Sequence, residues 1–228
     1  MKVRIKFSKK GVMKYIGHLD LQRYFQKAIR RANIDVAYSE GYSPHQIMSF
    51  ASPLGVGLES EGEYFDVELN SFITLKEVVD ELNKVMAEGM AVLDAVVLPE
   101  GAGNAMASIE AARYVVASQN DKVARLFTEE IISKFLANEE ILVTKESKKS
   151  TRELDIRPLI YDMKVHEKGL ELLVCASSAG NIKPGLVIGE LCRQNSEVLG
   201  KFDLEVTRIE LYSLDSEDKL ISLGDCGE

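Results

Sequence analysis

The chain has 228 residues, of which 46% are hydrophobic and 28% are charged, a balance typical of a globular protein with one large or two small domains. Charge alternates with apolar residues from Lys2 to Phe7, which excludes a secretory signal, and no apolar run is long enough to cross a membrane. The three cysteines are scattered, which excludes a disulfide framework and a clustered iron–sulfur site. We therefore expect a cytoplasmic protein that makes no membrane contact and has no cofactor of its own.

The net charge of −8 is unevenly distributed along the sequence. Residues 1–50 contain ten Lys and Arg against three acids, a balance of +7, so the remaining residues carry −15. This asymmetry favours a basic face that meets an anion, with the acidic remainder keeping the protein in solution. An ordinary solvated helix surface would give the same pattern.

The first elements are a strand and a basic helix. Lys2–Phe7 alternates cationic with apolar residues and predicts a half-buried strand with a cationic outer face. A helix is predicted over 19–32, with Asp20 as its cap. Basic residues recur along another side of this helix at steps of three and four: Arg23, Lys27, Arg30 and Arg31.

The rest of the first module alternates strands and a helix. Strands are expected at 36–39, 47–51, 63–69 and 90–98, with a helix capped by Thr74 over 75–88. The order strand, helix, strands, helix, strand predicts a ferredoxin-like, split βαβ module on an antiparallel sheet. We place this module at residues 1–100 and a linker at 101–112.

The second half repeats this plan. Strands are expected at 113–118, 141–144 and 202–209, a helix at 122–136, a polar loop at 146–151, a hairpin at 162–176 and a helix from Pro184 to Cys192. The predicted fold class is thus α+β, with two ferredoxin-like modules and antiparallel sheets. The second module covers 113–213, and 214–228 is an acidic tail.

Two loops hold two of the three histidines. Gly11–Asp20 contains His18, and Gly41–His45 ends in His45. Both loops lie at the ends of predicted elements, so we expect them to meet at one edge of the sheet. His18, Asp20 and His45 are therefore the candidate catalytic residues.

These residues fit several chemistries. The two imidazoles and the carboxylate could act as a general acid and base, hold a metal, or simply pin the loops by hydrogen bonds to the backbone. Asp20 is explained as a helix cap and the spacing matches no zinc signature, so we predict no metal site. Anion binding is the further alternative, and its candidate substrate-binding residues are Lys6, Lys9, Arg23, Lys27, Arg30, Arg31, Tyr42 and Ser43.

Several short motifs lie along the chain: Lys6-Phe7-Ser8-Lys9-x-Gly11, Gly17-His18-Leu19-Asp20, Ala28-x-Arg30-Arg31-Ala32, Tyr38-Ser39-x-Gly41-Tyr42-x-Pro44-His45, Phe50-Ala51-x-Pro53-Leu54 and Glu61-Gly62-Glu63-Tyr64-x-Asp66. Together they resemble the radical-SAM-associated, or radical-SAM-linked, bacterial protein family, also called domain of unknown function 2344, with weaker matches at 152–158 and 183–185. The family loop commonly reads Gly-Phe-Asn-Pro-His-Pro. Here it reads Gly-Tyr-Ser-Pro-His-Gln, with Gln46 in place of a rigid proline.

The resemblance implies a radical-SAM protein as partner, and that partner would carry the iron–sulfur cluster and S-adenosylmethionine. The first hypothesis is therefore an accessory, substrate-binding protein that holds RNA or another phosphate-bearing molecule. The alternatives are an independent enzyme that uses His18, Asp20 and His45, and a protein-interaction module whose basic patch docks an acidic protein.

Overall fold

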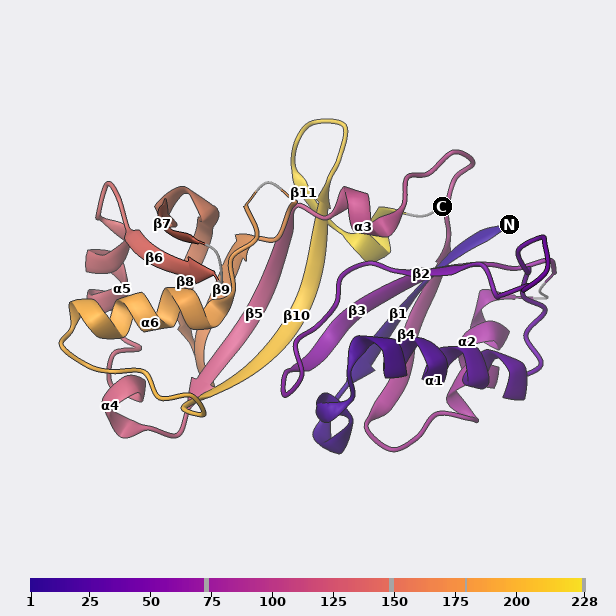
Figure 1. Cartoon of the computed structure of the whole chain (residues 1–228), viewed down its shortest axis with the longest axis horizontal. Coiled ribbons are helices and arrows are strands. Elements are labelled where there is room, and N and C mark those ends of the chain that lie inside the picture. The colour runs from indigo at the N-terminus through magenta and orange to yellow at the C-terminus, as the bar shows by residue number, and fades with distance from the viewer. Residues whose placement is uncertain (72–73, 148–149, 179, 227–228) are drawn as a thin grey trace. The chain divides into compact units, whose positions relative to one another are not determined.

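The computed structural model describes residues 1–71, 74–147, 150–178 and 180–226, and for 145–147 and 150–152 it describes the backbone alone. The chain divides into two compact units, Met1–Glu110 with Glu210–Glu228, and Ala111–Ile209. The boundary between Ile209 and Glu210 falls within strand β10 (Leu204–Leu214). The fold is mixed α+β with mostly antiparallel strands, as predicted (Figure 1).

The first unit holds the predicted histidine and basic residues. Its elements before β10 are β1 (Lys2–Lys9), η1 (Gly11–Tyr15), α1 (His18–Arg31), β2 (Met48–Phe50), β3 (Glu59–Glu68), α2 (Leu75–Asn83), β4 (Met90–Val97) and α3 (Ala105–Ser108). After β10 come β11 (Leu220–Ser222) and η3 (Leu223–Cys226). β1 pairs with β4 on one side and β3 on the other, and β2 pairs with β3, all antiparallel.

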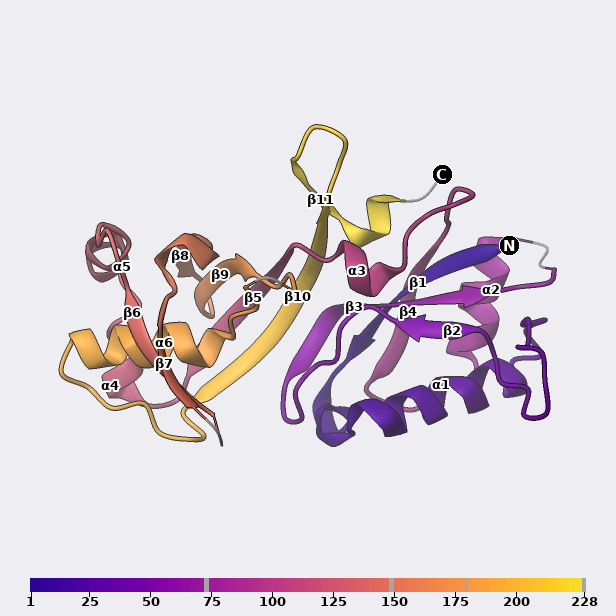
Figure 2. The same cartoon turned by 45° about the horizontal axis from the view of Figure 1, so that its top comes forward.

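The core of the first unit lies between this sheet and the helices. α1 buries Leu21, Phe25, Ala28 and Ile29 on one side. Phe25 lies 4.6 Å from Phe7 of β1 and 4.7 Å from Phe65 of β3, measured between ring centroids. Phe50 of β2 joins the same cluster, 5.2 Å from Phe65. Burying each of these rings contributes roughly 2 kcal/mol, so α1 is firmly attached to this face of the sheet (Figure 2).

The second unit has its own sheet and core. Its elements are β5 (Ala111–Ser118), α4 (Asp121–Ala124), α5 (Glu129–Leu136), β6 (Leu142–Ser147), β7 (Ser150–Asp155), η2 (Arg157–Leu159), β8 (Ile160–His166), β9 (Gly169–Cys175) and α6 (Pro184–Gln194). The strand order is β10-β5-β9-β8, while β6 and β7 form a separate two-stranded sheet. Val116, Leu172 and Leu191 are among its fully buried residues.

Several predicted elements are confirmed. Thr74 caps α2 by accepting a hydrogen bond from the Glu77 amide at 3.1 Å. Pro184 lies in the first turn of α6. β8 and β9 form the predicted hairpin, which closes at Gly169 with φ +139°.

Other predictions are wrong in detail. Gly17, not Asp20, is the N-cap of α1, because the helix begins one residue before the predicted start and places Asp20 in its first turn. The helix expected over 122–136 is two helices, since Thr128 caps a new start by accepting from the Ile131 amide at 3.4 Å. The expected strand at 36–39 makes only isolated bridges, through Val36 and Tyr38.

The remaining predicted regions contain regular structure. The polar loop at 146–151 falls on the β6–β7 hairpin, with residues 148 and 149 outside the described residues. Residues 101–112, the predicted linker, include α3, and residues 214–228, the predicted tail, include β11 and η3. In the described part of the chain, no helix is both long enough and apolar enough to span a membrane.

Candidate functional site

The exposed side of α1 carries a row of cations. Arg23, Lys27 and Arg30 follow at steps of four and three, so they lie on one side of the helix, opposite its buried residues. Arg31 adjoins them, and all four are exposed. We call Arg23, Lys27, Arg30 and Arg31 the α1 basic stripe.

Two cations of the α1 basic stripe, Lys27 and Arg30, have neither an ion pair nor a side-chain hydrogen bond among the described residues. Arg23 Nη1 lies 3.5 Å from Asp20 Oδ1, and Arg31 Nη2 donates to the Val85 carbonyl at 3.2 Å. Within the described ranges, no carboxylate lies within 4.0 Å of the charged groups of Lys27 or Arg30. The helix dipole accounts for cations in the last turn but not for Arg23 and Lys27 in the middle.

The cations of β1 behave differently, and the predicted cationic outer face of this strand is not free. In the antiparallel register, Arg4 lies opposite Asp66 and Lys2 opposite Glu68. Lys6 Nζ lies 2.6 Å from Glu210 Oε2. Arg4 and Lys2 lie close to Asp66 of the neighbouring strand β3, and Lys6 pairs with Glu210 of β10, so these cations are neutralised within the protein.

Lys9 is a correction to the predicted substrate contacts. Its side chain is only 1% exposed, and its Nζ lies 3.5 Å from the Lys14 carbonyl, one of the contacts that hold it. The register of β1 shifts between Phe7 and Lys9, which turns Lys9 inward. Lys9 therefore cannot meet a phosphate from solvent, and Lys6 can do so only by leaving Glu210.

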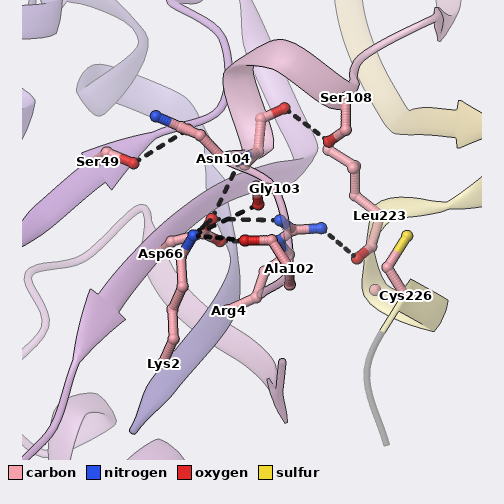
Figure 3. A network of polar contacts seen from close by, with 12 residues as sticks. Lys2, Arg4, Ser49, Asp66, Ala102, Gly103, Asn104, Ser108, Leu223 and Cys226 are labelled. Carbon is pink, nitrogen blue, oxygen red and sulfur yellow. Dashed lines mark hydrogen bonds and ion pairs between the residues drawn. The ribbon is translucent and has the colours of Figure 1, made fainter. Parts of the chain in front are cut away.

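Asp66 is the centre of a buried polar network (Figure 3). Arg4 donates from Nε to Asp66 Oδ1 at 2.8 Å and from Nη2 to Oδ2 at 3.2 Å. Asp66 Oδ2 also accepts from the Ala105 amide at 3.2 Å, and Lys2 Nζ lies 3.6 Å away. Arg4 Nη1 donates to the Leu223 carbonyl at 3.3 Å. The bidentate Arg4–Asp66 pair therefore links two further elements to the sheet: α3 through the Ala105 amide and η3 through the Leu223 carbonyl.

A polar cavity of about 370 Å³ opens beside this network on the sheet face opposite α1. Its polar lining is Lys2, Ser39, His45, Ser49, Asp66, Glu68 and Asn104. Ser39 Oγ lies 2.8 Å from His45 Nδ1 and accepts from the His45 amide at 3.1 Å, which orients the imidazole. Because two carboxylates face a single ammonium group, the cavity does not suit an anion.

His18 lies elsewhere, so the expected convergence of the two imidazoles is not met. The His18 ring contacts Phe50 edge-on at 5.6 Å, on the side of the sheet that α1 covers. Ser49, the neighbour of Phe50, points to the opposite face and into the cavity that His45 lines. Within the described residues, no hydrogen bond or ring contact joins His18 to His45.

Asp20 also stands apart from His45. It is exposed on the first turn of α1, where its carboxylate faces Arg23. The contacts of the described residues thus do not join His18, Asp20 and His45, and their catalytic role stays a prediction. In the part of the chain that the structure describes, no cluster of three His, Cys, Asp or Glu side chains is arranged to hold a metal.

Tyr42 and Ser43 lie at the tip of the loop that ends in His45. Tyr42 has a relative exposure of 110%, and Ser43 is exposed as well. The base of the loop is closed by the Ser39 amide, which donates to the His45 carbonyl at 2.8 Å. Both predicted residues are thus accessible to a ligand.

Sequence reasoning missed the Arg4–Asp66 pair. The signal is present as two alternating patterns, the cations Lys2, Arg4 and Lys6 and the acids Asp66 and Glu68. Cross-strand pairing would follow from them only once the register is known. Without the register, the β1 cations predict a surface for phosphate instead.

Residues 2–184 match a family described as an uncharacterized protein conserved in bacteria (DUF2344). The chain belongs to this family. The match covers most of the first unit, including α1, the loop from Ser39 to His45 and Asp66. No curated protein matches the chain closely enough to suggest an activity.

Proposed function

We propose that this chain is an accessory protein that binds RNA or another phosphate-bearing substrate for a radical-SAM enzyme. The observation that carries the proposal is the α1 basic stripe, where four exposed cations share a helix with a single acid, Asp20. A polyanion would gain contacts to Lys27 and Arg30 without breaking an ion pair.

The radical-SAM partner is the part of the proposal that rests on the sequence motifs. Their resemblance to the radical-SAM-linked family implies a separate enzyme that supplies the iron–sulfur cluster and S-adenosylmethionine. The chain's own contribution would be to bind and orient the substrate. The strand orders β4-β1-β3-β2 and β10-β5-β9-β8 support the proposal that each unit is a ferredoxin-like scaffold for this role.

The phosphate contact is tested by charge reversal. In Lys27→Glu/Arg30→Glu we expect affinity for a fluorescein-labelled RNA pool to fall about tenfold or more. The slope of log K against log salt concentration should become shallower by roughly 1.4, since two phosphate contacts are lost. The measurement is fluorescence anisotropy over a salt series.

The matched control is Lys122→Glu/Lys134→Glu, which reverses two exposed lysines on α4 and α5 of the second unit. It changes the net charge equally and should leave RNA affinity nearly unchanged. Equal losses in both variants, or binding that is independent of salt, would remove the proposal.

The partner is tested by co-purification from the native host, with bound RNA and bound proteins both identified. We expect RNA together with a protein that contains a clustered cysteine triad of the iron–sulfur type. Recovery of an acidic protein and no RNA would support the interaction-module alternative.

A further inference from the structure

The loop between α1 and β2 exposes two aromatic rings, those of Tyr38 and Tyr42. Tyr42 is fully exposed, and Tyr38 is 49% exposed. Both tyrosines lie within eight residues of His45, which is also exposed. Isolated apolar residues are common on protein surfaces, but two exposed tyrosines in one segment that contacts the helix with the α1 basic stripe call for a binding explanation.

A hydrogen bond attaches this loop to the middle of α1. Gln46 Nε2 donates to the Gln26 carbonyl at 3.3 Å, and Gln26 precedes Lys27 of the α1 basic stripe. The same Nε2 lies 3.5 Å from the hydroxyl of Tyr38. Tyr38 thus sits beside the helix that carries the cations.

The contact with Gln46 leaves Tyr38 able to bind a ligand. Its oxygen accepts a hydrogen from the Gln46 amide, so the tyrosine's own hydrogen remains available as a donor. Tyr42 lies beyond the point where Ser39 and His45 close the loop, so its ring stands clear of the protein. Both rings therefore offer flat faces on which a ligand could stack, in the same unit as the α1 basic stripe.

We propose that Tyr38 and Tyr42 stack on the bases of a single-stranded polynucleotide whose phosphates lie on the α1 basic stripe. This inference rests on the proposed function and names the substrate class. Aromatic faces and cations together bind single strands without regard to sequence, because every base has a stacking face. In a duplex the bases are already stacked on one another, and protruding tyrosines cannot reach them.

The test measures binding of the full chain to a short fluorescein-labelled RNA, to the DNA of the same sequence and to the RNA duplex. We expect both single strands to bind more tightly than the duplex. Tyr42→Ser should weaken single-strand binding about tenfold and leave duplex binding unchanged. Because Tyr42 makes no buried contact, the variant should keep the wild-type melting temperature.

The matched control is Phe202→Ser in the second unit. Phe202 is 86% exposed and has Lys201 Nζ 5.2 Å from its ring centroid, so it also pairs an exposed ring with a cation. This variant should bind every probe as the wild type does. A second readout uses 2-aminopurine in the single strand, whose fluorescence should be quenched on binding to the wild type but not to Tyr42→Ser.

The outcomes separate this inference from the proposed function. If Lys27→Glu/Arg30→Glu loses binding while Tyr42→Ser does not, the phosphate contact stands and base stacking is overturned. Duplex binding as tight as single-strand binding overturns stacking too. If the wild type binds none of the probes, both proposals fail.

Discussion

Asp66 shows how much of the first unit depends on a single carboxylate. It is 2% exposed and is contacted by Arg4, by Lys2 and by the Ala105 amide. Its bidentate partner Arg4 is 3% exposed and cannot deprotonate at any ordinary pH. The two charges are therefore tolerable in the interior only as a pair.

We expect Asp66→Asn to lower the free energy of unfolding by about 3 kcal/mol, because it leaves the buried Arg4 guanidinium without a counter-charge. Urea titration followed by circular dichroism measures the change. The control is Glu61→Gln, which breaks the exposed Lys10–Glu61 pair and should cost less than about 1 kcal/mol. Similar losses in the two variants would show that Arg4 finds another partner.

Tyr64 makes stability depend on pH. Its hydroxyl donates to Glu210 Oε1 at 2.6 Å, and burial, together with the negative charge of Glu210, raises the pKa of Tyr64 above its usual value. The folded state therefore holds this proton more tightly than the unfolded state does. The resulting stabilisation is complete below about pH 10 and is lost as the pH rises above it.

Tyr64→Phe removes this dependence. At neutral pH the variant should be less stable by about 2 kcal/mol, since a hydrogen bond to a charged acceptor is lost. The difference from the wild type should shrink by about 1 kcal/mol between about pH 9 and about pH 11. Urea titrations of both proteins at each pH measure this, and a constant difference would contradict the assigned pKa direction.

At the scale of elements, the two faces of the sheet in the first unit differ: one packs against a helix through apolar side chains, and the other carries ion pairs. One face packs on α1 through apolar residues, and α1 in turn exposes its basic stripe. On the other face Arg4 of β1 pairs with Asp66 of β3, and Lys6 of β1 pairs with Glu210 of β10. The available positive charge therefore lies on a helix rather than on the strand.

Hairpin β8–β9 depends on the glycine at its turn. Gly169 has φ +139°, and a Cβ there would lie 2.3 Å from the Val116 carbonyl oxygen of β5. We expect Gly169→Ala to cost about 2 kcal/mol or more of unfolding free energy, from backbone strain and from displacement of β5. Thermal and urea denaturation measure the loss.

Gly189→Ala is the matched control for Gly169→Ala. Gly189 lies within α6, and a Cβ there would meet only Leu199 Cδ2 at 3.9 Å. Alanine favours the helix over glycine by about 1 kcal/mol, so this variant should be at least as stable as the wild type. If both variants were destabilised to a similar extent, the loss in Gly169→Ala could not be assigned to the backbone conformation and close contact of Gly169.

At the scale of the whole molecule, the last residues of the chain complete the first unit. Glu210–Glu228 belongs to the same unit as Met1–Glu110. Leu223 is fully buried, its carbonyl accepts from Arg4, and η3 contacts β1 and β4. The first unit is therefore assembled from both ends of the chain.

Leu223→Ala should destabilise the first unit by about 3 kcal/mol through loss of apolar contacts and a residual cavity. Hydrogen exchange should accelerate mainly in β1, β3 and β4. The control is Leu191→Ala, which removes a fully buried side chain of α6 and should accelerate exchange mainly in β5 and β9. The same exchange pattern in both variants would show that the two units open together.

Local patterns in the sequence by themselves determined the α+β class, most helices and strands, and the basic side of α1. Each of these depends on periodicity or on a cap such as Thr74, and both act between residues close in the chain. The family motifs likewise identified the segment that contains α1 and the loop to His45.

Only the tertiary structure decided which charges are free and which rings meet. Strand register pairs Arg4 with Asp66, and a one-residue slip would have exposed the opposite set of side chains. The alternation of side chains along β2 separates the contacts of His18 from the cavity of His45. Contacts between residues so distant in sequence follow from the packing of the sheet as a whole, because no local pattern specifies its register.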